Sequence, residues 1–89
     1  MTIQHWTDDK VDFRYFIGKQ TVEVRLKHLD TVDKTGKPIP NYEVFARNPG
    51  SKDWLLISTI TEPIELAKST RHERIRALVR MFVDDLPKL

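Results

Sequence analysis

The first part of the chain alternates apolar and polar residues in two runs, 11–17 and 21–27, with Gly18 and Lys19 between them. A period of two is typical of β-strands that bury one face. Glycine at the first central position of a two-residue turn suits the type II′ geometry that joins hairpin strands. The pattern therefore predicts a β-hairpin that turns at Gly18.

The turn also predicts the register of this hairpin. Pairing across the turn sets Tyr15 opposite Val22 and places the apolar residues of both strands on one face. Opposite charges then face each other on the other face, where cross-strand pairs stabilise a sheet. The two expected pairs are Arg14 with Glu23 and Asp12 with Arg25.

A second hairpin is predicted over 42–47 and 54–60, which are rich in β-branched and aromatic residues. The intervening Asn-Pro-Gly-Ser at 48–51 has proline and glycine where a type II turn needs them. Alternation along both strands separates the apolar residues into two faces. One face carries Tyr42, Val44, Ala46, Leu55 and Ile57, and the other carries Phe45, Trp54 and Leu56. Residues 30–40, between the hairpins, contain two prolines and many turn formers, and we expect a loop there.

The C-terminal part has helical periodicity. Its apolar residues recur at intervals of three and four, and Pro87 ends the pattern. Two starts are compatible with the sequence: a Thr-x-x-Glu capping box at Thr70, or an earlier start near Thr61. These starts correspond to a short helix followed by a main one, or to one long helix. The apolar stripe consists of Ile75, Leu78, Val79, Phe82 and Leu86.

Together these elements predict a single α+β domain over residues 1–89. Its antiparallel sheet has about four strands in ββββα order, and one C-terminal amphipathic helix packs on one face. We expect Leu78 and Phe82 to be buried against that face. Since one helix covers only one face, the apolar residues on the other face need a different cover.

Two arrangements would cover that outer face. The N-terminal segment, which contains Trp6, folds back over it, or the face is an interface with a second copy or another protein. The candidate interface residues are Trp6, Phe45, Trp54 and Leu56.

The composition narrows the class of protein. The chain has 39% hydrophobic and 31% charged residues, as a folded soluble domain has. Cysteine is absent, which excludes disulfides and thiol chemistry and favours a reducing compartment. Residues 1–6 lack the features of a signal peptide, and no apolar run approaches the ~20 residues of a membrane span. We therefore expect a cytoplasmic protein with no membrane partner.

The charge is concentrated on the predicted helix. Residues 67–80 carry five basic residues and one acid, a net +4, whereas the whole chain carries +2. Arginine, which dominates this segment, suits bidentate contacts to phosphates and carboxylates. The alternative is a solvated face in which Glu73, Arg76, Arg80 and Asp84 form ion pairs. The candidate contacts for nucleic acid or another anion are Lys68, Arg71, His72, Arg74, Arg76 and Arg80.

Helix geometry limits which of these residues act together. Arg74 and Arg76 lie about 160° apart around a helix of 3.6 residues per turn. A contact surface would therefore use the Arg76–Arg80 side or the end that contains Lys68, Arg71 and His72.

Little in the sequence points to catalysis. His5, His28 and His72 lack the spacing of metal ligands, and no set of nucleophile, base and orienting residue can be assembled. We expect no enzyme activity, no metal and no cofactor. The predicted function is a small non-enzymatic binding or regulatory module that contacts nucleic acid or an acidic protein surface through its arginine-rich helix. The alternative is a homo-oligomeric interaction domain, such as a homodimer, that uses the outer apolar sheet face.

Overall fold

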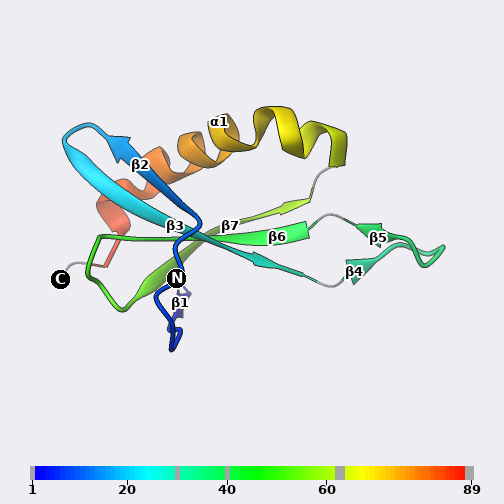
Figure 1. Cartoon of the computed structure of the whole chain (residues 1–89), viewed down its shortest axis with the longest axis horizontal. Coiled ribbons are helices and arrows are strands. Elements are labelled where there is room, and N and C mark those ends of the chain that lie inside the picture. The colour runs from blue at the N-terminus through cyan, green and yellow to red at the C-terminus, as the bar shows by residue number, and fades with distance from the viewer. Residues whose placement is uncertain (1, 30, 40, 62–63, 88–89) are drawn as a thin grey trace.

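The computed structural model describes residues 2–29, 31–39, 41–61 and 64–87, with the backbone alone over 64–70. The chain forms an α+β fold in which one helix lies along a five-stranded antiparallel sheet (Figure 1). The strand order is β1-β7-β6-β3-β2. These strands are β1 (Ile3–Gln4), β2 (Phe13–Ile17), β3 (Gln20–His28), β6 (Asn41–Arg47) and β7 (Trp54–Thr61).

The first hairpin has the predicted register. Tyr15 pairs with Val22, and Gly18 has a φ of +64°, which a type II′ turn requires at that position. On the opposite face the Nε of Arg14 lies 3.1 Å from a carboxylate oxygen of Glu23, as the register predicted.

The second predicted charge pair is wrong. Arg25 binds the carboxylate of Asp8, not that of Asp12. The side chain of Asp12 instead accepts a hydrogen bond of 2.8 Å from the backbone N–H of Leu26. The reason is that β2 begins at Phe13, so Asp12 precedes the strand and its carboxylate satisfies a backbone donor of β3.

The second hairpin contains a bulge that alternation alone does not predict. Its turn has the expected type II features: Gly50 has a φ of +87°, and the Ser51 N–H donates to the Asn48 carbonyl at 3.1 Å. Phe45 pairs with Leu56, but the preceding residue of β6 pairs with Ser58, so β7 has one extra residue. Because of this extra residue, the Ile60 side chain points to the inner face of the sheet, where it is 7% exposed.

The prediction of four strands in ββββα order is wrong in two places. The short strand β1 adds a fifth strand to the sheet beside β7. The expected loop at 30–40 contains a second, two-stranded sheet, β4 (Thr31–Val32) with β5 (Pro38–Ile39), which projects from the body as a ribbon (Figure 1). At the tip of this ribbon the Asp33 carboxylate accepts hydrogen bonds from Thr35 and Lys37. Strands of two residues are too short to show alternation.

The helix is continuous, which decides between the two starts. α1 spans Ile64–Phe82, so Thr70 lies inside it, and the 3₁₀ turn η1 (Val83–Asp85) follows. Leu86 is extended, as expected for a residue that precedes proline. No helix in the described part of the chain is long and apolar enough to cross a membrane.

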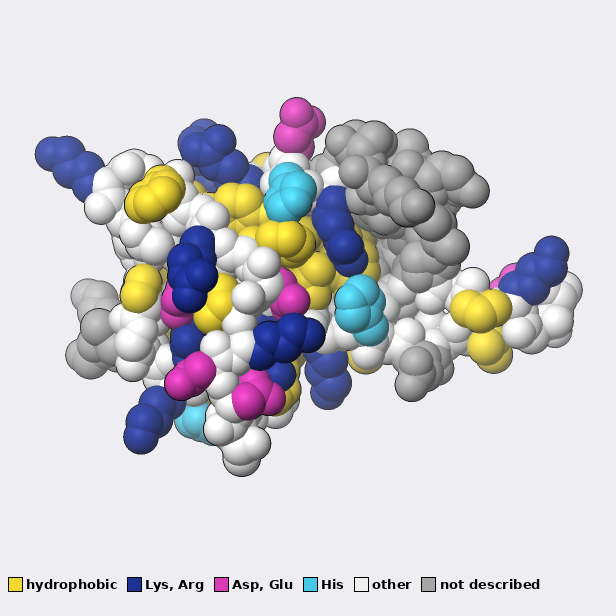
Figure 2. Space-filling view, in the orientation of Figure 1, with side chains coloured by type: hydrophobic (Ala, Val, Ile, Leu, Met, Phe, Trp, Pro, Cys, Tyr) yellow, Lys and Arg dark blue, Asp and Glu magenta, His cyan; other side chains and the backbone are white. Residues whose placement is uncertain are grey.

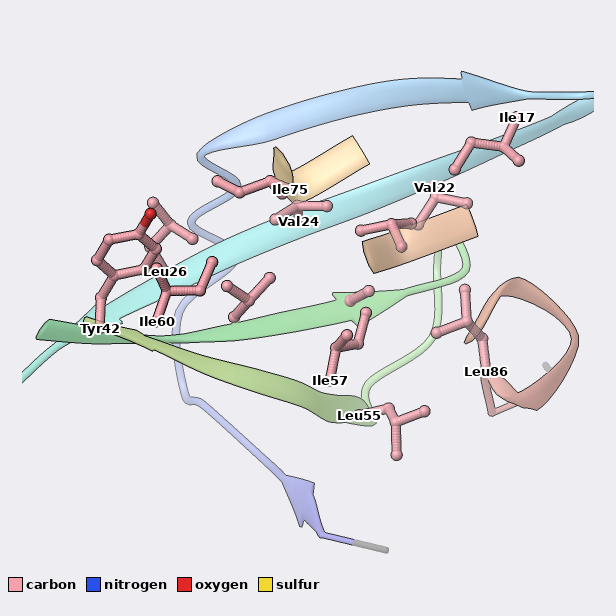
Figure 3. Close-up of a cluster of buried hydrophobic side chains, with 13 residues drawn as sticks. Ile17, Val22, Val24, Leu26, Tyr42, Leu55, Ile57, Ile60, Ile75 and Leu86 are labelled. Carbon is pink, nitrogen blue, oxygen red and sulfur yellow. The ribbon is translucent and has the colours of Figure 1, made fainter. Parts of the chain in front are cut away.

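The core lies between α1 and the inner sheet face (Figure 3). From the helix side, Ile75 and Val79 are completely buried, and Leu86 folds in behind them at 3% exposure. Leu78 and Phe82 pack against this core but are only partly buried, which corrects the expectation that they are buried. The sheet contributes aliphatic side chains from every long strand, namely Ile17, Val22, Val24, Leu26, Val44, Ala46, Leu55, Ile57 and Ile60.

Candidate functional site

The basic residues of α1 do not converge on one surface. Arg71 rests on the Tyr42 ring, and Arg76 and Arg80 lie about 140° and 180° around the helix from it, with His72 between them beside Tyr15. Figure 2 shows the Lys and Arg side chains of one face of the molecule distributed over it rather than gathered into one patch. The predicted set therefore splits into two groups.

Two further candidates are Arg74 and Lys68. Arg74 is exposed and already has an interaction within the chain. The side chain of Lys68 lies outside the described residues.

The first group forms what we call the basic helix surface, on the side of α1 that faces away from the core. A shallow hollow of about 430 Å³ runs along this side. Positions three and four apart bring its residues together on one helix face. They are Glu73, Arg76, Ala77, Arg80 and Met81.

The backbone of an aromatic residue on the sheet adjoins this surface. Arg76 donates a hydrogen bond of 3.3 Å to the backbone carbonyl of Phe16 on β2, which is an edge strand of the sheet. The Phe16 residue is 74% exposed, as is Met81 on the helix, and the Phe16 ring alternates with the inward-facing Tyr15 and Ile17 along β2. Sequence reasoning missed Phe16, although the signal was present: it is an aromatic residue at a position where alternation calls for a polar one.

The expected ion pairs of a solvated helix face are not formed. Among the described side chains, the salt bridges join residues of the N-terminal segment, the sheet and the β6–β7 turn. None of them involves Arg76 or Arg80. Among the residues that line the hollow, Glu73 is the acid beside Arg76 and Arg80.

The second group of basic residues packs against aromatic rings on the inner sheet face. The guanidinium carbon of Arg71 lies 4.8 Å from the centroid of the Tyr42 ring. His72 Nδ1 is 3.0 Å from the hydroxyl oxygen of Tyr15. The His28 ring on β3 lies 6.0 Å from the ring of Tyr42, its partner on the neighbouring strand β6. We call these residues, Tyr15, His28, Tyr42, Arg71 and His72, the aromatic–basic cluster.

The outer sheet face is covered by the N-terminal segment. The Trp6 ring meets Phe45 edge-on at 4.8 Å and Trp54 edge-on at 5.8 Å. As a result Phe45 is 2% exposed and Trp54 is 1% exposed within the single chain, while Leu56 is half-buried. Of the two arrangements considered, the structure has the folded-back segment. A further interface at this face stays a prediction.

Charged groups complete this cover. The guanidinium carbon of Arg25 lies 4.3 Å from the Trp6 ring, and that of Arg47 lies 4.3 Å from the Trp54 ring. Arg47 also donates to a Glu23 carboxylate oxygen at 2.9 Å and is 7% exposed. Stacking of arginine on aromatic rings, with a carboxylate at its edge, allows these charges to be buried.

A second hollow, of about 410 Å³, lies beside this layer. Its charges largely neutralise one another, because Glu23 bridges Arg14 and Arg47. Asp9 lies 3.8 Å from Arg47 at the rim. This hollow therefore offers a ligand fewer unsatisfied groups than the helix does.

The three histidines lie in two regions of the molecule. His5 pairs with Asp53 at 3.1 Å, whereas His28 and His72 belong to the aromatic–basic cluster. In the parts of the chain that the structure describes, no three His, Cys, Asp or Glu side chains are arranged to hold a metal ion.

Comparison with protein-family models gives no match, and neither the curated proteins nor the solved structures give a significant one. The function is therefore inferred from the chemistry of the side chains.

Proposed function

We propose that the protein is a small non-enzymatic binding module whose basic helix surface contacts the phosphate backbone of a nucleic acid. The observation that carries this proposal is the position of Arg76 and Arg80. They lie on one helix face, outside any salt bridge among the described residues, and Arg76 binds the backbone carbonyl of the exposed Phe16. The lack of cysteine fits a cytoplasmic setting for such a module.

The charge distribution supports a phosphate partner. Arginine binds phosphate oxygens through two parallel N–H groups. A face with two such residues and one acid supplies sequence-independent attraction, because phosphate contacts position a protein without reading bases. An isolated pair of arginines is a modest contact, so we expect weak binding that depends on salt.

Phe16 indicates which kind of nucleic acid is preferred. Bases of a single strand are free to stack on an exposed ring, and such stacking contributes about 1–3 kcal/mol per base. In a duplex the bases already stack on one another. We therefore expect stronger binding to single-stranded than to double-stranded nucleic acid.

The test is a titration with short single-stranded and duplex oligonucleotides at several salt concentrations. Two phosphate contacts predict a log–log slope of about −1 to −2. Arg80→Glu should reduce both the affinity and the slope. Phe16→Ala should weaken single-strand binding about tenfold and leave the slope unchanged, because the ring carries no charge.

Lys34→Glu on the projecting ribbon is the matched control, since it reverses one charge at a site remote from α1 (Figure 1). It should leave binding within about twofold of the original. No binding at low salt, or an equal loss in Arg80→Glu and Lys34→Glu, would reject the proposal. Binding to poly-glutamate in place of oligonucleotides, with no effect of Phe16→Ala, would favour an acidic protein partner.

A further inference from the structure

Arg71 of the aromatic–basic cluster lies on a different side of α1 from the basic helix surface, and His72 lies between the two. Arg71 precedes Arg76 by five residues, which places the two side chains about 140° apart around the helix. Figure 2 shows His side chains and basic side chains at the border of an apolar area on this face. The cluster thus combines cations with aromatic rings at the surface.

Two buried hydrogen-bonding atoms in the cluster have no partner among the described residues. They are the hydroxyl oxygen of Tyr42 and the Nε of Arg71. Tyr42 is 2% exposed, and Figure 3 shows its ring rising from β6 beside Leu26, with the hydroxyl at the end away from the strand. Buried polar groups are nearly always hydrogen-bonded, and leaving them unpaired destabilises the fold. Both atoms are attached to hydrogens that can be donated.

The cluster also lacks an anion. Among the residues with described side chains, no carboxylate forms a salt bridge with Arg71, whose guanidinium rests on the Tyr42 ring. Burial raises the pKa of Tyr15 above its usual value, although the charge of Arg71 opposes this. The Tyr15 hydroxyl therefore keeps its proton at neutral pH. None of the five residues that form the cluster is acidic.

We propose that the aromatic–basic cluster binds the phosphate group of a small ligand. Its donors come from α1 and from β6, with histidines of β3 and α1 at the sides. Donors on several elements suit a tetrahedral phosphate, whose oxygens accept in several directions, better than a planar carboxylate. Inorganic phosphate and the phosphate ester of a nucleotide share this chemistry.

The test measures the binding of inorganic phosphate, adenosine monophosphate and acetate at constant ionic strength. The readouts are the melting temperature and the ¹H–¹⁵N signal of the Arg71 Nε–H. Phosphate should raise the melting temperature and shift this signal, whereas acetate should do so at much higher concentration. Tighter binding of the monophosphate than of inorganic phosphate would assign the site to nucleotides, and the reverse would assign it to the free ion.

Two conservative variants identify the site. Tyr42→Phe removes only the hydroxyl, and Arg71→Lys keeps the charge but removes the Nε donor. Each should weaken phosphate binding about tenfold or more, as expected for a hydrogen bond to a charged group. Arg80→Lys, on the other side of the helix, should leave binding unchanged.

A further measurement separates ligand binding from a structural role. Without phosphate, Tyr42→Phe should be at least as stable as the original chain, because it removes an unpaired buried hydroxyl. A marked fall in its melting temperature would show that the hydroxyl is bonded within the fold, and would overturn the proposal. So would phosphate binding that both variants leave intact. If Arg80→Glu alone abolished that binding, the phosphate would belong to the basic helix surface, and the proposed function would stand without this site.

Discussion

The two faces of the main sheet are buried by different physical means. The inner face is aliphatic and is covered by the 19-residue helix α1. The outer face carries Phe45, Trp54 and charged residues, and its cover is the short N-terminal segment with Trp6. The inner layer gains stability from apolar area removed from water. In the outer layer, each group depends on particular neighbours.

Arg47 illustrates this dependence. Its guanidinium lies on the Trp54 ring and donates to Glu23 and to the Ser51 carbonyl at 2.9 Å in each case. A buried charge that loses a partner destabilises a fold strongly, whereas replacing the whole pair by apolar residues is often neutral. Substitutions on the inner face should therefore destabilise the fold in proportion to the side-chain volume that they remove. On the outer face, the loss of stability should depend on which interaction partner is removed.

The largest effect is expected on the inner face. Ile75→Ala should lower the free energy of unfolding by about 2–5 kcal/mol, because Ile75 is fully buried and its loss leaves a cavity. Urea denaturation measures this change. Met81→Ala is the matched control on the same helix, where 74% exposure predicts a change within about 0.5 kcal/mol. Equal effects of the two substitutions would contradict the packing of α1 on the sheet.

The second effect concerns the buried ion pair of the outer face. Glu23→Gln should cost about 2–3 kcal/mol, less than the 3–5 typical of a broken buried pair, because Arg47 retains its bond to Ser51. The double variant Glu23→Leu with Arg47→Met should be more stable than Glu23→Gln, since no buried charge is then left unpaired. A double variant that is less stable than the single one would show that outer-layer stability depends on the ion pair itself.

The third effect decides what covers the outer face. Trp6→Ala should cost about 1–2 kcal/mol, below the 3–5 of a fully buried tryptophan because Trp6 is only half-buried. It should also expose Phe45 and Trp54, so light scattering at micromolar concentration should show a monomeric parent and a variant that associates. A parent dimer that Trp6→Ala or Phe45→Lys dissociates would instead identify this face as the predicted homodimer interface.

The sequence predicted the features that depend on local pattern. The turn at Gly18, the pairing of Tyr15 with Val22 and the apolar stripe of the helix all follow from spacing and glycine geometry. The bulge in β7 was missed because strict alternation along a strand does not reveal an extra residue, and the two-residue strand β1 was missed because its partner β7 is distant in sequence.

The candidate site shows the same limit. The concentration of arginine on α1 was visible, but its division between two surfaces was not. Helix geometry alone excluded a single surface, whereas only tertiary contacts place Phe16 beside Arg76 and Tyr42 beneath Arg71. The residues that adjoin these arginines come from strands far away in the sequence.

The smallest effect is a pH dependence of the outer cover. The hydrogen bond from Arg25, followed by that from the backbone of Lys10, lowers the pKa of Asp8 below its usual 3.8. A carboxyl group whose pKa is lower in the folded chain stabilises the fold above its unfolded pKa, and this contribution is lost as the pH falls through the folded value. Asp8→Asn should therefore reduce the loss of stability below about pH 4, and only slightly, since Asp8 is exposed and salt screens the pair.

Melting temperatures between about pH 2 and 7 measure this dependence in the range where Asp and Glu titrate. Asp33 provides the matched control, because hydrogen bonds from Thr35 and then Lys37 also lower its pKa, but at the tip of the projecting ribbon. The ribbon lies apart from both faces of the main sheet, so Asp33→Asn should change the acid limb of global unfolding less than Asp8→Asn does. If the two variants have the same acid limb as the parent, the pairing of Asp8 with Arg25 adds nothing to the cover. The outer layer would then depend on Trp6 and the Glu23–Arg47 pair alone.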